Sequence, residues 1–406
     1  MTMGMVLGAW LGAATARAEP APEVTGALTV TELVALLRRG PELVAARARV
    51  DAARAELRSR LPWAPNPELE AELGLEPAEA EHVHAAVGLR QALPLFAERE
   101  AGREAARAAV AAAQAEADEV LRGRAIEATR ALAALGRARA LAAIEAEADE
   151  VAAALADAAG RREAAGEIPE DDAALLRMEA TLAARAHDEA RAAVARGEIA
   201  ACRLIAREPC AAPPELAPVV SAPPTPEALE AVLVRRADRV AADRRVEAAR
   251  AELVHARGEA RVEPVVGLGF EREVDAHAGV VWRVVGTIGL ELPVWDPREG
   301  LVDRHAAALA EGEAAREVVR RDATARAREA HAEWTAAALA ETRMTGLAEV
   351  GRRVVDNARA AWEQGALALE RVLLLRDRTF VARRALVDAR WRLVEARALL
   401  ELEMPL

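Results

Sequence analysis

The chain has 406 residues, of which 53% are hydrophobic but only 2% aromatic. Alanine is the best helix former and buries little area per residue, so this composition favours long, closely packed helices over one thick globular core. The net charge of −12, with arginine interleaved among acidic residues, disfavours nucleic acid as a partner.

The N-terminus has the pattern of a secretory signal. The stretch MTMGMVLGAWLGAATARAEP contains an apolar segment followed by Ala16-Arg17-Ala18, an A-x-A type cleavage site. We therefore predict a signal peptide at 1–18 and export, with an apolar N-terminus of no targeting function as the alternative. No later stretch reaches the roughly 18 consecutive apolar residues that a transmembrane helix needs.

The first half predicts a helix followed by a β-hairpin. Thr29 or Thr31 is a candidate cap for the helical region, which ends at three prolines between 62 and 67. The segment NPELEAELGLE (66–76) then alternates leucine or alanine with glutamate, which is typical of a strand with two different faces. With a second alternating segment, it predicts a hairpin over 68–93.

Two long helices are expected after the hairpin. No proline occurs between Ala97 and Gly166, and a helix of that span would be on the order of 100 Å long. Gly166, with Pro169 just beyond it, ends this helix, and a return helix is predicted from Glu170 to about Arg207. Such helices must pair as coiled coils or join a larger assembly.

The second half repeats the plan of the first. Three landmarks recur in the same order: RVDAARAEL (49–57) as RVEAARAEL (245–253), LPLFAERE (93–100) as LPVWDPRE (292–299), and Gly166 as Gly365. We predict two structural repeats, 19–208 and 228–406, joined by a proline-rich connector at 209–227. The second repeat places its hairpin at 264–292 and its tip at 365.

No catalytic constellation, cofactor motif or metal site is predicted. His82 and His84 share a strand face near a turn, where the alternatives are a metal-binding pair and solvated polar residues. Cys202 and Cys210 either close a small disulfide loop or are two unpaired thiols. We predict that the protein is not an enzyme.

The strand segments have the dimensions of membrane-spanning strands. Hairpin strands of about 9 to 13 residues match what a tilted barrel needs to cross a bilayer. A soluble amphipathic sheet covering a core is the alternative. The export signal, the lack of another sheet partner and aromatic residues near strand ends favour the membrane; these are Trp63, Phe96, Trp282 and Trp295. Four strands are too few to enclose water, so several copies must contribute.

This order of elements resembles the TolC family of outer-membrane efflux proteins over essentially the whole chain. The resemblance rests on NPELEAELG, on LPLF and LPVW closing the hairpins, and on the tip segments RREAAGEIPEDD and AAWEQGALALER. It implies a mainly α fold with a small β part: a homotrimer in which four strands per chain complete a twelve-stranded outer-membrane β-barrel, and the long helices form a periplasmic α-helical barrel.

The resemblance also implies sites. The tips that would meet a periplasmic adaptor protein comprise Gly166, Glu167, Ile168, Gly365, Ala366 and Leu367. The tip constriction would comprise Asp172, Glu370 and Arg371. Glu68, Glu70, Glu72 and Glu76 would face the barrel lumen, and Leu69, Leu73, Leu75 and Trp282 would face lipid. The family often has an aspartate six residues after each tip glycine. Asp172 fits, whereas Arg371 departs from the pattern unless its neighbour Glu370 replaces the acid.

The implied function is a passive exit duct of a tripartite efflux system. Its partners would be the adaptor, outer-membrane lipid and an inner-membrane pump of the resistance-nodulation-division type, with metal cations or small drugs as cargo; the heavy-metal cation efflux branch is the nearer resemblance. Type I protein secretion, a periplasmic coiled-coil adaptor or scaffold, and an exported enzyme are the alternatives. A scaffold leaves the apolar hairpins without a purpose.

Overall fold

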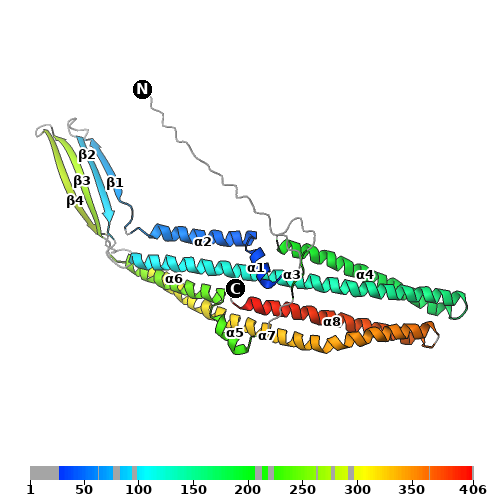
Figure 1. The fold of residues 1–406 in the computed structure, drawn as a ribbon. Coiled ribbons are helices and arrows are strands. Elements are labelled where there is room, and N and C mark those ends of the chain that lie inside the picture. Colours follow the sequence, from blue (N-terminus) through cyan, green and yellow to red (C-terminus); the bar gives the residue numbers. More distant parts are fainter. Residues whose placement is uncertain are drawn as a thin grey trace, which may run out of the picture.

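The protein is an elongated helical body with a β-sheet at one end (Figure 1). The computed structural model describes residues 27–62, 64–75, 83–93, 98–205, 213–217, 224–261, 264–275, 279–290, 297–364 and 366–404. The helices are α1 (Val30–Leu37), α2 (Pro41–Arg60), α3 (Glu98–Ala164), α4 (Glu170–Leu204), α5 (Pro226–Leu233), α6 (Ala237–Glu259), α7 (Glu299–Glu363) and α8 (Leu369–Glu403). The strands are β1 (Glu68–Leu75), β2 (Val83–Ala92), β3 (Pro264–Asp275) and β4 (Gly279–Leu290). The order α2-β1-β2-α3-α4 recurs as α6-β3-β4-α7-α8.

The first helix begins where the sequence places a cap. Thr29, and not Thr31, is the N-cap of α1: its hydroxyl accepts a hydrogen bond from the Glu32 N–H at 3.2 Å, and the Glu32 carboxylate accepts one from the Thr29 N–H at 2.9 Å. This reciprocal capping box satisfies two donors that the helix itself leaves unpaired. Pro41 then starts α2, where its missing N–H costs nothing.

Two very long helices set the length of the body. α3 has 67 residues and α7 has 65, which at a 1.5 Å rise makes each about 100 Å long. α3 contacts α4 and α6, whereas α7 contacts α8 and α6, so both halves of the chain share one bundle. Small residues allow close approach: a Cβ on Gly136 of α3 would lie 2.0 Å from the Trp391 ring of α8. None of the described helices is both long and apolar enough to cross a membrane.

The proline-rich connector takes part in the core. Within it, Leu216 forms a parallel β-bridge with Leu28 and is buried with it. The Leu28 N–H donates to the Glu215 carbonyl, and the Ala217 N–H donates to the Leu28 carbonyl, both at 2.7 Å. Sequence periodicity gives no signal for such a single bridge. Nearby, Cys202 at the end of α4 is disulfide-bonded.

The sheet is an antiparallel meander with strand order β1-β2-β3-β4. Continuous registers join β1 to β2, β2 to β3 and β3 to β4. The predicted hairpins are therefore present, and they combine into one sheet. Among the described strands, β1 and β4 each have a single neighbour, so each leaves one edge unpaired.

Several residues that the sequence singled out lie outside the described residues. They are Trp63, Glu76, His82, Phe96, Cys210, Trp295 and Gly365. Leu75 and Glu370 are described for their backbone alone.

Candidate functional site

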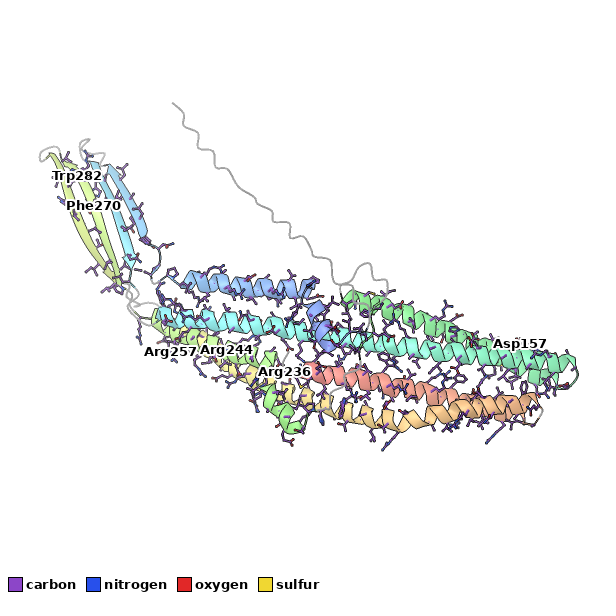
Figure 2. The ribbon with its side chains drawn as sticks, viewed as in Figure 1. Asp157, Arg236, Arg244, Arg257, Phe270 and Trp282 are labelled. Carbon is purple, nitrogen blue, oxygen red and sulfur yellow. The ribbon has the colours of Figure 1, made fainter. Side chains whose placement is uncertain are left out.

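One face of the sheet is apolar across all four strands. The register places Leu69 beside Leu89 and Leu268, and Val87 beside Phe270 and Val284. Figure 2 shows Phe270 and Trp282 on neighbouring strands near the far end of the sheet. The side chains of Leu69, Leu73 and Trp282 are 73%, 71% and 69% exposed. An apolar surface of this extent marks an interaction face, because water does not stabilise it.

The other face of the sheet is polar. Strand alternation puts Glu68, Glu70 and Glu72 opposite Leu69 and Leu73, as the sequence predicts. The middle of this face consists largely of small residues, and it is hollowed; the hollow is lined by Glu70, Glu72, Gly88, Arg90, Gly267 and Gly269, among others. A Cβ on Gly88 or Gly269 would meet no atom closer than 3.8 Å, whereas on Gly267 it would lie 2.3 Å from the Thr287 hydroxyl oxygen.

Two cross-strand ion pairs on the polar face were missed from the sequence. Arg90 of β2 donates to Glu70 of β1 at 2.8 Å, and Arg283 of β4 lies 2.9 Å from Glu273 of β3. Glu72 has no ion pair with any described residue. Acidic side chains still outnumber basic ones on this face, but of the glutamates on β1 at least Glu70 has its charge offset by an arginine.

Arg272 interrupts the apolar face near its far end. It is the register partner of Trp282, and its guanidinium carbon lies 5.9 Å from the centroid of the Trp282 ring. A guanidinium over an indole face is a favourable cation–π contact. Alternation along the strand places Arg272 among apolar residues. That the Trp282 ring lies against its guanidinium depends on the strand register, which the sequence does not give.

The first helix tip has a glycine C-cap. Gly166 follows α3 with φ of 74°, the left-handed conformation that favours glycine. Its N–H donates to the Glu163 carbonyl, and the Glu167 N–H donates to the Arg162 carbonyl, both at 2.9 Å. This pair of bonds is a Schellman motif. At the second tip the Ala366 N–H makes the matching bond to the Ala361 carbonyl at 2.8 Å.

The two tips pack against each other around Trp362. This side chain is 3% exposed and lies in a cluster formed by all four long helices, with Ile168 and Leu367 packed against it. The Arg162 guanidinium lies 5.2 Å from the Trp362 ring centroid, contacts Glu167 at 3.2 Å and donates to the Trp362 carbonyl at 3.4 Å. Glu167, Ile168 and Leu367 were predicted at the tips, whereas Arg162 and Trp362 were not.

Comparison with known proteins identifies this architecture. No protein-family profile matches the sequence, and no curated protein matches it. Solved structures do. The outer membrane protein VceC of Vibrio cholerae is 17% identical, with a TM-score of 0.78 over 93% of this chain and 96% of that one. A membrane protein of Pseudomonas aeruginosa is 19% identical, with a TM-score of 0.77 over 92% and 93%.

The CmeC outer membrane channel of Campylobacter jejuni is 14% identical, with a TM-score of 0.77 over 93% of this chain and 85% of that one. The chain has the fold of the TolC-type outer-membrane channels. The comparisons do not distinguish the heavy-metal branch from the others.

In this TolC-type fold the predicted constriction residues sit in the first turns of the return helices. Asp172 lies in the first turn of α4 and Arg371 in that of α8, where Arg371 is exposed. The structure shows no ion pair between Asp172 and Arg371. Other ion pairs join the α3–α4 and α7–α8 helix pairs, among them Arg376 of α8 with Glu179 of α4 at 2.5 Å and Arg384 of α8 with Glu145 of α3 at 2.6 Å.

Proposed function

We propose that this protein is the outer-membrane exit duct of a tripartite efflux system. Three copies of the chain would form one channel with a membrane-embedded β-barrel and a helical tunnel in the periplasm. The tunnel would act passively, on substrates delivered by an inner-membrane pump of the resistance-nodulation-division type through a periplasmic adaptor. The TolC-type fold over almost the whole chain supports this proposal.

The observation that carries the proposal is the two-faced sheet with its free edges. An open sheet with unpaired edges is prone to pair with other strands, and β1 and β4 are free to do so. If β1 of one chain paired with β4 of the next, three copies would close a twelve-stranded barrel. Closure would place the hollowed polar face inside and the apolar face outside, as a barrel in lipid requires.

The strand lengths fit a bilayer. β3 and β4 have 12 residues each. At about 3.3 Å per residue and a tilt of about 40°, such strands rise roughly 30 Å, which is the thickness of the hydrocarbon core. Leu69, Leu73, Leu75 and Trp282 would then face lipid.

The charges of the polar face point to cationic cargo. In the closed barrel, Glu68, Glu70, Glu72 and Glu76 of three chains would line the lumen, where confined carboxylates raise the local concentration of cations. Arg90 and Arg283 reduce this effect by pairing with Glu70 and Glu273. Metal cations or small cationic drugs are the cargo that such a lumen favours.

The tips at the opposite end would meet the adaptor. The predicted contact residues are Gly166, Glu167, Ile168, Gly365, Ala366 and Leu367, of which Ile168 and Leu367 pack against the cluster at Trp362. A rigid, glycine-capped turn presents a fixed surface, which suits docking. Asp172, which is half-buried, and Arg371, which is exposed, would border the tunnel entrance at these tips.

Cell fractionation of a Gram-negative host expressing the full chain tests the proposal. We expect the protein in the outer membrane as a heat-modifiable trimer that resists SDS, and we expect it to restore efflux in a host lacking its own outer-membrane channel when the matching pump and adaptor are co-expressed. Recovery as a soluble monomer would overturn the proposal.

A further inference from the structure

A pocket of about 290 Å³ lies where four parts of the chain meet near the middle of the helical body. Its wall includes Arg38 after α1, Asp118 and Arg122 of α3, Arg235 and Arg236 before α6, and Met404 after α8. Four arginines thus face one carboxylate. The pocket is far from both the sheet and the helix tips, and the proposed duct does not use it.

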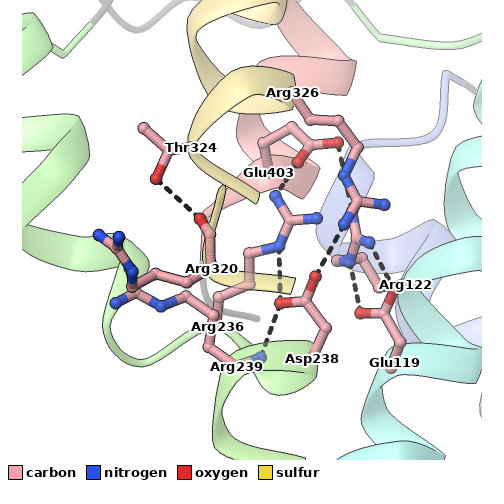
Figure 3. A network of polar contacts seen from close by, with 9 residues as sticks. All are labelled: Glu119, Arg122, Arg236, Asp238, Arg239, Arg320, Thr324, Arg326 and Glu403. Atoms are coloured by element: carbon pink, nitrogen blue, oxygen red, sulfur yellow. Dashed lines mark hydrogen bonds and ion pairs between the residues drawn. The ribbon is translucent and has the colours of Figure 1, made fainter. Parts of the chain in front are cut away.

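Beside the pocket lies a buried network of ion pairs (Figure 3). Arg236 is fully buried; it contacts Glu403, and it donates to Asp238 at 3.0 Å. Arg122 contacts the same Glu403 at 3.2 Å and Glu119 at 2.5 Å. Burying these charges is costly, and only well-placed partners offset the cost.

One donor in this network is left over. Nη2 of Arg236 is buried and has no hydrogen-bond partner in the part of the chain that the structure describes. Figure 3 shows this nitrogen on the side of Arg236 that faces Arg122, which also lines the pocket. An unpaired buried guanidinium nitrogen loses its hydration without compensation, so an acceptor delivered to the pocket would stabilise it.

The rest of the wall also favours negative charge. Arg38 and Arg235 are exposed and form no ion pair with any described residue. At the start of α6, the carboxylate of Asp238 already accepts a hydrogen bond from the Arg239 N–H at 2.8 Å, so the arginine side chains are the groups left to attract an anion. Asp118 is the one carboxylate in the pocket wall; partial burial raises the pKa of its carboxyl, whereas the charge of Arg38 lowers it.

We propose that this pocket binds an oxyanion, through the guanidinium groups of Arg38, Arg235 and Arg236. Phosphate and carboxylate groups share the required chemistry, since both present several acceptor oxygens to planar guanidinium donors. The bound anion would link the end of α1 to the start of α6. This site does not depend on the proposed duct function.

Titration calorimetry on the full-length protein in detergent tests the site, with inorganic phosphate in one arm and succinate in the other, at constant ionic strength. We expect saturable binding in at least one arm, and the stronger arm identifies the class of anion. The double variant Arg38→Gln/Arg235→Gln should weaken that binding at least tenfold. Arg39→Gln, next to Arg38 but outside the pocket wall, should bind as the wild type does.

Asp118→Asn gives a test of opposite sign. Removing the opposing carboxylate should tighten anion binding, which no general loss of structure would produce. The proposal is overturned if neither anion binds saturably, if the double variant binds as tightly as Arg39→Gln, or if Asp118→Asn weakens binding. Thermal unfolding of each variant without anion checks that the fold is intact.

Discussion

The sheet and the helix tips differ in how far the chain covers their large apolar side chains. On the sheet, large apolar side chains such as Leu69 and Ile288 are 73% and 80% exposed. At the tips, the large aromatic side chain of Trp362 is 3% exposed and packed by four helices of its own chain. The chain itself therefore leaves the apolar side chains of the sheet uncovered, and under the proposed function lipid and further copies would cover them, whereas the cluster at the tips is packed within one chain.

This contrast predicts different consequences of substitution. A change on the apolar face of the sheet should affect insertion and assembly, which depend on what lies outside the chain. A change in the tip cluster should affect local stability in each chain. The four predictions below separate these outcomes.

The largest effect is expected for Leu73→Arg. If this side chain faces lipid, a guanidinium there costs about 2–4 kcal/mol per chain near the midplane, and the trimer bears it three times. We expect loss of the SDS-resistant trimer from the outer membrane. Glu72→Arg is the matched control, because it adds the same group one residue away on the polar face. Normal insertion of Leu73→Arg together with failure of Glu72→Arg would mean that the two faces are reversed.

Trp362→Ala should destabilise the tips without preventing insertion. Removing a buried tryptophan costs about 3–5 kcal/mol, and it also removes the ring under Arg162. Faster hydrogen exchange in the ends of α3, α4, α7 and α8, with an unchanged amount of trimer, is the expected result. Trp362→Phe keeps most of the packing and should show a smaller effect. Loss of the trimer in Trp362→Ala alone would show that the tip end is not self-sufficient.

The sequence predicted the sheet better than the tips for a physical reason. Alternation with a period of two fixes which face each strand residue occupies, so Glu70 and Leu73 could be assigned to opposite faces before any pairing was known. Which glutamate pairs with Arg90 depends on the register, and periodicity does not give the register. Trp362 is buried because two helix pairs that are distant in the sequence, α3–α4 and α7–α8, meet at the tips. The bridge at Leu216 likewise depends on a single tertiary contact.

Gly166→Val should have a moderate effect confined to the first tip. Valine in the left-handed conformation costs about 1–2 kcal/mol, so the Schellman bonds of Gly166 and Glu167 should weaken. We expect reduced adaptor binding and efflux with normal trimer assembly, and a larger loss when Gly365→Val is added. Gly166→Asn is the control, since asparagine tolerates this conformation. Normal transport by the double valine variant would count against adaptor docking at these turns.

The smallest effect is expected from the charges on the polar face of the sheet, and its sign is informative. In planar-bilayer recordings, Glu70→Gln with Glu72→Gln should leave insertion intact and lower the preference for cations, by about twofold or less because exposed charges are screened at physiological salt. Arg90→Gln should raise that preference, because it releases Glu70 from its ion pair without altering the apolar face. The two changes differ in sign only if both side chains line the conducting lumen. Equal reversal potentials in all variants would place this face outside the ion path, and the sheet would then require a different partner from the one proposed.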